Sequence, residues 1–264
     1  MSGQTQDLAA AVATNKATEG ADSSAKAVTA TTRLTNRTQI SVKGISVSGT
    51  QRAMNPAGRA DELGYQLSLA ALELRRDMES SLTQNTVTAT APRALRGLVG
   101  WAGDNTDGAV AGTAYVAPDY VNNVAQTDGT QIAFTEARLK NVLQKCFTAG
   151  GDPDTLLLGP GQKQTFSTFT GNATRMDKSE DKKLYAGVDV YISDFGELKA
   201  VPSRFSRARD VWVLQSDKWA VCYLRPFTTI ELAKTGDADN RQLVVEYTLE
   251  ARSPKANGAV VDCL

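Results

Sequence analysis

Residues 48–84, SGTQRAMNPAGRADELGYQLSLAALELRRDMESSLTQ, contain the longest helical pattern in the chain. Apolar residues recur there every three or four positions, as they do on the buried face of a helix. The segment Asn55-Pro56-Ala57-Gly58 has turn chemistry and lies just ahead of the periodic run. The pattern predicts a helix over about residues 58–84, roughly 40 Å long at 1.5 Å per residue, on which a lobe can be built. Its expected core stripe is Leu63, Leu67, Ala70, Leu74 and Met78.

The composition of the 264 residues excludes several kinds of site. Lys plus Arg and Asp plus Glu each number 29, and a net charge of zero argues against an electrostatic nucleic-acid binder. The chain has no histidine, which removes Ser-His-Asp and Cys-His nucleophiles and most zinc sites. We therefore predict no catalytic residue, no metal site and no cofactor. Because no signal peptide opens the chain and no apolar run approaches about 18 residues, we expect synthesis in the cytoplasm and no membrane contact.

The first 36 residues are rich in Ala, Thr, Gly and Ser and carry few large apolar side chains. Such a segment cannot bury enough surface to offset the entropy that it loses on ordering. Two hypotheses fit this composition. The segment is either a disordered tail, or an extended arm or hairpin that is held against another chain.

Residues 38–49 are typical of a strand. Ile40 and Val42 alternate with polar residues, and Ile45 and Val47 alternate in the opposite phase. One extra residue next to a glycine would produce this change of phase at Lys43-Gly44. We therefore expect a β-bulge or bend at that point, between the arm and the body.

The middle of the chain predicts a mixed α/β region. Residues 85–130 have little charge and no clear periodicity, whereas residues 135–148 have helical spacing and end at Gly150-Gly151. Residues 155–158 indicate a short buried strand, and Gly159-Pro160-Gly161 opens a helix that reaches residue 169. The spacing of this Gly-Pro-Gly-Gln-Lys run does not fit a phosphate-binding loop.

The last third of the chain is predicted to be β-rich. Residues 188–193 and 198–201 form one expected hairpin, and residues 211–214 and 219–224 form another. Residues 228–250 indicate a long two-stranded ribbon.

The order of these elements and the residues within them are specific. The stretches that carry a resemblance are VSGTQRAMNPAGRADELGYQL, ELRRDMES, RALRGLVGW, EARLKNVLQKCFTAGGDPDTLLLGPGQKQ, VDVYISDFGELKAVPSRF, RDVWVLQSDKWAVCYLRPFTTIELAKTGD and VEYTLEARSPKANG. In these stretches the chain resembles the major capsid proteins of tailed bacteriophages, which have the Hong Kong 97-like (HK97-like) fold. The first residues resemble the start of this family's extended loop, so we expect the further N-terminal arm that is usual in the group to be lacking.

The resemblance implies an α+β subunit in three parts. An extended loop or arm would comprise residues 1–45. A peripheral domain, carrying the long spine helix and a long β-hairpin, would comprise residues 46–115 and 228–252. A mixed α/β axial domain would comprise residues 120–227 and 255–264.

The resemblance also implies a structural function. The subunit would self-assemble into hexamers and pentamers of an icosahedral head that encloses double-stranded DNA, and it would be found in the virion. Portal and scaffolding proteins, and a cement or decoration protein, are the further partners implied, with only indirect contact to DNA. We expect contacts with neighbouring subunits at charged residues of the peripheral domain, namely Arg52, Arg59, Arg75, Arg76, Glu246 and Glu250.

Two alternatives remain at this stage. The same fold could form the shell of an encapsulin-like compartment, which would hold a cargo enzyme in place of DNA. A hydrolase that uses pairs of carboxylates is the other alternative, although Asp152, Asp154, Glu246 and Glu250 are more simply turn and surface residues. We interpret Arg204, Arg207 and Arg209 as solvated or interface charges.

Overall fold

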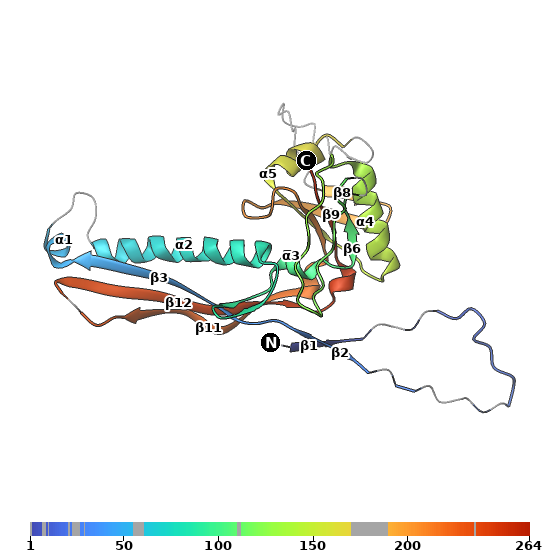
Figure 1. Cartoon of the computed structure of the whole chain (residues 1–264), viewed down its shortest axis with the longest axis horizontal. Helices are drawn as coiled ribbons and strands as arrows, with labels where there is room; N and C mark the ends of the chain where they lie inside the picture. Colours follow the sequence, from blue (N-terminus) through green and yellow to red (C-terminus); the bar gives the residue numbers. More distant parts are fainter. Residues whose placement is uncertain are drawn as a thin grey trace, which may run out of the picture.

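A computed structural model describes residues 2–6, 9, 11–20, 22, 27–28, 30–54, 61–109, 112–169, 190–234 and 236–264. These residues form a head, a long lobe and a thin arm that extends away from both (Figure 1). Within them, no helix combines the length and the apolar character that a membrane crossing requires.

The long lobe is a three-stranded antiparallel sheet with one long helix along one face. The strands lie in the order β11 (Trp219–Glu231), β12 (Ala238–Ala251) and β3 (Gln39–Ser48). Helix α2 (Glu62–Gln84) packs on β3 and β12. The helix starts where the Asp61 side chain accepts a hydrogen bond from the Leu63 amide at 3.1 Å, as an N-cap should. The core between helix and sheet consists of Ala70, Leu74, Met78, Leu95, Leu243, Val245 and Tyr247, with Ile45, Leu67 and Leu82 partly buried at its margin.

The helix stripe predicted from the sequence faces this core. Leu63, Ala70, Leu74 and Met78 are buried, and Leu67 is partly buried. The helix itself is shorter than predicted, because it begins at Glu62 after a separate turn of helix, α1 (Gly49–Ala53). Its 23 residues span about 34 Å. The expected turn at residues 55–58 and the first predicted helical residues, 58–60, lie outside the described part of the chain.

The bulge predicted at Lys43-Gly44 is wrong. Strand β3 pairs with β12 in one unbroken register from Gln39 opposite Tyr247 to Ser48 opposite Ala238. Ile45 and Val47 point toward α2, whereas Ile40 and Val42 point to the outer face of the sheet and stay about two-fifths exposed. The change of phase therefore marks a strand with apolar residues on both faces, with no extra residue.

The head contains a six-stranded mixed sheet covered by helices. Its buried cluster joins Leu139, Val142 and Cys146 of α4 to Leu156 and Leu158 of the central strand β7. Helix α4 ends at Thr148, and Gly150 just after it has a φ of +82°, which suits glycine. In order, the strands are β6 (Asn105–Asp107), β13 (Gly258–Val260), β10 (Val211–Leu214), β7 (Thr155–Leu158), β9 (Gly196–Pro202) and β8 (Val190–Ser193), and the helices are α4 (Glu136–Thr148) and α5 (Pro160–Phe166).

Several predictions for the head are confirmed and one is wrong. The hairpin of β8 and β9, strand β7 and helix α4 lie within a few residues of their predicted positions. The predicted hairpin of residues 211–214 with 219–224 does not form, because β10 pairs with β7 and β13 while β11 runs into the long lobe. Short elements connect the two parts, namely β4 (Ala89–Thr90), β5 (Arg93–Ala94), α3 (Leu98–Trp101) and the 3-10 turns Ser216–Lys218 and Pro254–Ala256.

The predicted boundaries between the three parts differ from the places where the strands pair. Residues 39–45, predicted in the extended loop, belong to β3 of the long lobe. Residues 219–227, predicted in the axial domain, belong to β11 of the same sheet. Strand β6, predicted in the peripheral domain, pairs with β13 in the head.

The arm is a long hairpin with few contacts to the body. Strand β1 (Ser2–Thr5) pairs antiparallel with β2 (Thr32–Thr35), and residues 11–20 between them are exposed. Leu34 is buried against Trp101, Leu249 and Ala251, at the point where the arm meets the body.

Candidate functional site

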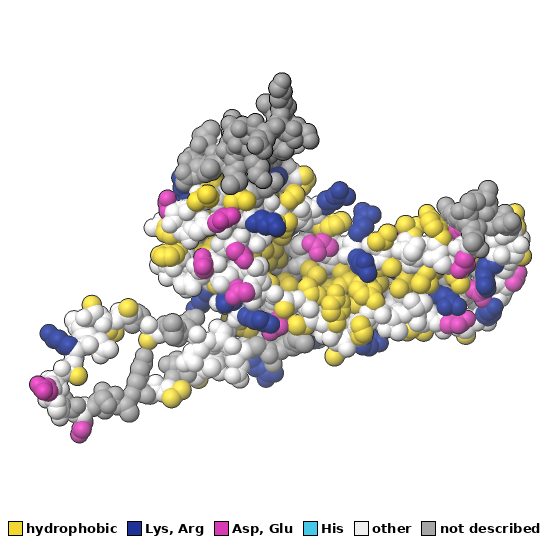
Figure 2. Space-filling view, turned by 180° about the vertical axis from the view of Figure 1, so that it is seen from behind, with side chains coloured by type: hydrophobic (Ala, Val, Ile, Leu, Met, Phe, Trp, Pro, Cys, Tyr) yellow, Lys and Arg dark blue, Asp and Glu magenta, His cyan; other side chains and the backbone are white. Residues whose placement is uncertain are grey.

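An apolar groove runs along the long lobe because α2 does not cover the whole sheet. The helix packs on β3 and β12, so the neighbouring strand β11 keeps its helix-facing side chains uncovered. Figure 2 shows hydrophobic side chains gathered on this side of the long lobe, with basic residues beside them. The groove, which we call the α2–β11 groove, is lined by Arg75, Met78, Glu79, Leu82, Val221, Tyr223 and Phe227.

Aromatic residues form the exposed wall of the α2–β11 groove. Tyr223 is 48% exposed and Phe227 is 37% exposed, and their ring centroids are 6.3 Å apart. The guanidinium of Arg75 lies 5.7 Å from the centroid of the Phe227 ring, within range of a cation–π contact. An exposed aromatic cluster beside an arginine has the composition of a protein-binding surface.

The opposite face of the same sheet also exposes apolar side chains. Ile40 and Val42 of β3 lie on this outer face, and Leu224 and Ile230 of β11 are exposed as well. Leu224 is 62% exposed and lines a pocket with Cys222 and Thr248. Apolar residues on both faces of one sheet are expected where the sheet is completed by other molecules.

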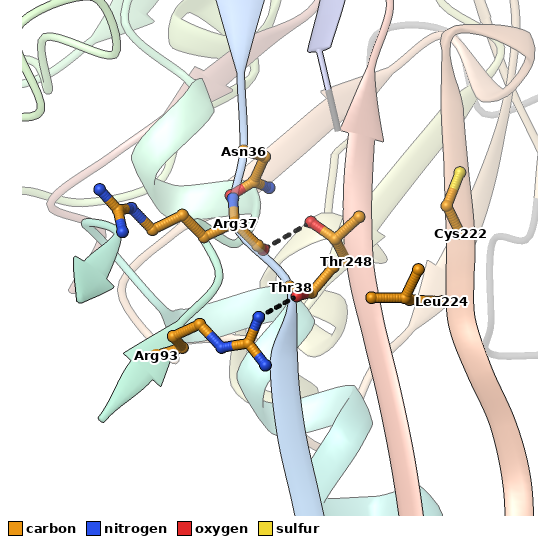
Figure 3. Close-up of a pocket in the computed structure, with 7 residues that line it drawn as sticks. All are labelled: Asn36, Arg37, Thr38, Arg93, Cys222, Leu224 and Thr248. Atoms are coloured by element: carbon orange, nitrogen blue, oxygen red, sulfur yellow. Dashed lines mark hydrogen bonds between the residues drawn. The ribbon is translucent and has the colours of Figure 1, made fainter. Parts of the chain in front are cut away.

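The pocket on the outer face lies at the root of the arm (Figure 3). Here the chain passes from β2 into β3 through Asn36, Arg37 and Thr38. The backbone of these residues forms one wall, and β12 and β11 form the other. Arg93 reaches across from β5 and donates a hydrogen bond to the Thr38 hydroxyl at 3.2 Å.

Glu246 lies beside this pocket and is the most enclosed charge of the long lobe's outer face. Only 4% of its side chain is exposed. Its carboxylate accepts hydrogen bonds from the Thr38 hydroxyl at 2.7 Å and from Arg225 Nε at 2.9 Å, and it pairs with Arg93 Nη2 at 2.9 Å. The Thr38 hydrogen bond and the two guanidinium groups lower the pKa of Glu246 below its ordinary value.

The charged residues predicted to contact neighbouring subunits lie in different surroundings. Arg75 and Arg76 are exposed on α2, and Arg76 lies 5.8 Å from the ring of Phe205. Arg52 pairs with Asp239 within the chain. Glu250 is one-third exposed and lies 3.5 Å from Arg252.

Glu246 is predicted to be a surface residue that contacts a neighbouring subunit, but the structure places its carboxylate inside the subunit between two arginines of the same chain. Arg59 lies outside the described residues.

The head contains a closed network of charges. Arg207 pairs with Asp128 at 2.6 Å and with Asp210 at 3.2 Å, and Arg209 pairs with Asp262 at 2.5 Å. Asp210 and Asp262 are buried, and burial raises the pKa of Asp210 to about 6. Arg207 and Arg209 thus form ion pairs with aspartates of the same subunit, which corrects their interpretation as solvated or interface charges.

The remaining reactive groups have structural surroundings. Among the described residues, no three His, Cys, Asp or Glu side chains lie close enough to hold a metal ion. Burial raises the pKa of Cys146 and Cys263 to about 12, so their thiols stay protonated and unreactive. Asp154 accepts hydrogen bonds from the amide and hydroxyl of Ser216, as a turn residue does.

Sequence reasoning missed most residues of these surfaces. Tyr223 lies in a segment that is predicted to pair with residues 211–214, and Phe227 lies between two predicted segments. Asn36 and Arg93 carry no pattern of their own. A usable signal was present in β3, where Ile40 and Val42 are out of phase with Ile45 and Val47 because both faces of the strand are apolar.

The chain is similar to capsid proteins over its whole length. The family model described as SU10 major capsid protein matches residues 1–263. A major capsid protein of Escherichia phage Phieco32 is 25% identical, and the match covers 97% of this chain and 84% of the relative.

Solved structures of shell proteins share the fold. The capsid of Cyanophage A-1(L) matches with a TM-score of 0.60 and 17% identity, covering 100% of this chain and 88% of that one. The structure titled Gordonia phage Cozz matches with a TM-score of 0.58 and 14% identity, covering 99% and 80%. The SrpI encapsulin of Synechococcus elongatus PCC 7942 matches with a TM-score of 0.55 and 11% identity, covering 89% and 77%.

Proposed function

The chain belongs to the SU10 major capsid protein family, and from this premise we propose that its copies join through the long lobe and the arm. The protein is a major capsid protein of a tailed phage with the HK97-like fold, a component of the virion. Our proposal concerns how the subunits assemble. They form hexamers and pentamers of an icosahedral head that encloses double-stranded DNA.

The α2–β11 groove is the observation that carries this proposal. It exposes Tyr223, Phe227 and Val221 in one continuous surface beside Arg75, a composition that favours burial in an interface. Heterologous contacts of this kind close into rings of five or six when the rotation between copies allows it. We propose that a neighbouring copy packs into the groove, and that residues 1–38 form an extended loop that reaches over a neighbour.

Assembly by many weak contacts fits the way in which apolar surface is distributed. One groove buries little area, but each subunit of a shell repeats the contact with its neighbours, so avidity makes the lattice stable. The exposed part of the arm beyond its root becomes ordered only on docking, which keeps each single contact weak because part of the binding energy is used to order the chain. Synthesis in the host cytoplasm, and portal, scaffolding and decoration proteins as further partners, belong to the same proposal.

The experiment that tests the proposal replaces the aromatic wall of the groove. We expect the double variant Tyr223→Ser/Phe227→Ser to give folded subunits, because both side chains are partly exposed before assembly. These subunits should fail to form shells in electron microscopy and sedimentation velocity. The matched variant Tyr223→Phe/Phe227→Tyr keeps both rings and should assemble. Shells from the serine variant at wild-type yield would refute the role of the groove.

The SrpI encapsulin shares the fold, and this likeness supports a compartment shell as the second candidate. The two functions differ in what the particle contains. Nucleic acid extracted from purified native particles would support the phage head, and an enclosed enzyme without DNA would support the compartment.

A further inference from the structure

Hydrogen bonds hold the three residues at the root of the arm, Asn36, Arg37 and Thr38. The groups that make these bonds do not line the α2–β11 groove. Asn36 is buried, and hydrogen bonds hold both the nitrogen and the oxygen of its side-chain amide. Its Nδ2 donates to the carbonyl oxygens of Arg96 at 2.9 Å and Leu249 at 2.7 Å. Its Oδ1 accepts from the backbone amides of Arg37 at 2.9 Å and Arg96 at 2.8 Å. One side chain thus joins the arm to β12 and to the segment before α3.

The next two residues are fixed in the same way. The carbonyl oxygen of Arg37 accepts a hydrogen bond from the Thr248 hydroxyl at 2.8 Å, which Figure 3 shows across the pocket. The Thr38 hydroxyl donates to Glu246 at 2.7 Å and accepts from Arg93 at 3.2 Å. Arg225 of β11 closes the cluster from the other side of Glu246 at 2.9 Å. We call Asn36, Thr38, Arg93, Arg225 and Glu246 the root cluster.

The root cluster contrasts with the arm that it holds. On the N-terminal side of Asn36, the described part of the arm contributes Leu34 to the buried core, and residues 11–20 are exposed. Apolar contacts do not specify direction, whereas hydrogen bonds weaken steeply when their angles change. A buried polar group that loses its partner is costly, so the root cluster favours one arrangement of the backbone over others.

We propose that Asn36, Thr38 and Glu246 are positioning residues that fix the direction in which the arm leaves the long lobe. The consequence for assembly rests on the proposed function, because a fixed direction matters only if the arm must meet a particular site on a neighbour. An arm with the correct sequence but a free root would sample many directions, and few of them would fit the lattice. The root cluster therefore acts through the arm, without itself touching the neighbouring subunit.

The test measures the direction of the arm in unassembled full-length subunits. Cysteines introduced at the exposed residues Thr32 in β2 and Gln144 in α4 carry spin labels, in a Cys222→Ser background whose shell yield is first shown to equal that of the native chain. Pulsed electron resonance then gives the distribution of distances between the labels. We expect one narrow distribution for the otherwise native chain. Glu246→Gln should broaden it about twofold, because the amide cannot pair with both arginines.

Two further variants keep the test decisive. Thr38→Val removes only the hydroxyl and leaves Glu246 paired with Arg93 and Arg225, so it should fold normally and broaden the distribution by a smaller factor. Glu231→Gln is the matched control, since Glu231 lies in the same hairpin, is exposed and pairs only distantly with Arg241 at 3.8 Å. Its distribution should equal that of the native chain.

Shell yield provides the second readout. We expect Glu246→Gln to form shells at a yield at least about tenfold lower than Glu231→Gln, as expected when only a small fraction of arms is correctly placed. A distribution that stays narrow in both Glu246→Gln and Thr38→Val would overturn the inference. Wild-type yields from an arm with a broadened distribution would overturn its role in assembly, and would leave the groove, tested by its own variants, unaffected.

Discussion

The head and the long lobe differ in how far their large apolar side chains are buried. In the head, large apolar residues such as Trp212, Phe166 and Tyr191 are enclosed, and the charges of Arg207 and Arg209 meet aspartates of the same part of the chain. In the long lobe, Tyr223, Phe227 and Leu224 remain partly exposed while the carboxylate of Glu246 is buried. The described part of the head therefore has a closed core, although Phe147 on its surface is 58% exposed. We propose that the long lobe and the arm, in contrast, present surfaces for other copies.

This difference suggests two sets of contacts in one subunit: one that contributes to the folding free energy of the monomer, and one that contributes to the free energy of assembly. Contacts of the head and of the helix core stabilise the monomer, so their loss should appear as unfolding. We propose that contacts at the α2–β11 groove and along the arm contribute only after assembly, so their loss should leave a folded monomer. Variants of the two regions should separate these contributions, and the expected effect on the stability of the isolated subunit falls from Leu74→Asp to deletion of residues 1–31.

Leu74→Asp should have the largest effect. Leu74 is fully buried between α2 and the sheet. Truncation of a buried leucine alone costs about 2–5 kcal/mol, and an unpaired carboxylate in the same place costs more. We expect unfolded or aggregated protein in circular dichroism and no shells.

Leu72→Asp is the matched control for that variant. Leu72 is 57% exposed on the opposite side of the same helix, so the monomer should change in stability by less than about 0.5 kcal/mol in thermal unfolding. Equal losses of stability from Leu72→Asp and Leu74→Asp would show that α2 has no buried face.

Asp210→Asn should have the next largest effect, and the effect should depend on pH. Burial raises the folded-state pKa of Asp210 from 3.8 to about 6. The stability linked to its proton is fully present below about pH 4 and is lost as the pH rises through 6. Relative to Asp210→Asn, the native chain should therefore lose up to about 3 kcal/mol between pH 4 and pH 7.

Asp154→Asn is the control of opposite sign. Burial raises the pKa of Asp154, but the hydrogen bonds from Ser216 outweigh it, and the net pKa lies below the ordinary value. Its contribution to stability is present above pH 3.8 and is lost as the pH falls through the lowered pKa. Thermal unfolding of both variants from about pH 2 to pH 7 checks the two slopes, with the Asp154 effect at the acidic end and the Asp210 effect above pH 4. Parallel curves for Asp210→Asn and the native chain would show that the carboxyl of Asp210 is not constrained by the head.

Deletion of residues 1–31 should have the smallest effect on the monomer. The deletion keeps Leu34 and Asn36, which are buried in the body, and removes the part of the arm beyond them. We expect a melting temperature within a few degrees of the native chain, since a change of about 1 kcal/mol shifts it by only about 2–4 °C at this size. Stable shells should no longer form in electron microscopy. Efficient assembly of the shortened chain would remove the arm from the account.

Local patterns predicted helices α2 and α4 and the hairpin of β8 and β9 well, but not the short helices α1 and α3. Helix α4 lies at residues 136–148 as its spacing predicts, and the Asp194-Phe195 turn joins β8 to β9 because both strands are adjacent in the sequence. The stripe of α2 could be predicted because 3.6-residue periodicity requires no knowledge of the partner surface. Burial of Leu74 and Met78 follows from that pattern.

Pairing between strands that are distant in the sequence could not be predicted from local patterns. Strands β10 and β11 are neighbours in sequence and both are apolar, so a hairpin was expected, but each pairs with a strand from another part of the chain. The exposure of single side chains could not be predicted either. Phe147 of α4 has the spacing of a core residue, but it is 58% exposed beside Phe195. Asn36 bonds to Leu249, 213 positions away, and Glu246 bonds to Thr38, 208 positions away, and no local pattern contains such contacts.

Hydrogen exchange compared between unassembled subunits and assembled shells tests most directly whether the head is complete in the monomer while the arm and groove are completed by other copies. Amides of β7 and β10 in the head should be equally protected in both states. Amides of residues 11–20 should exchange rapidly in subunits and become protected in shells, together with those of β11 beside the groove. Strong protection of residues 11–20 already in isolated subunits, or no gain of protection on assembly, would contradict the account.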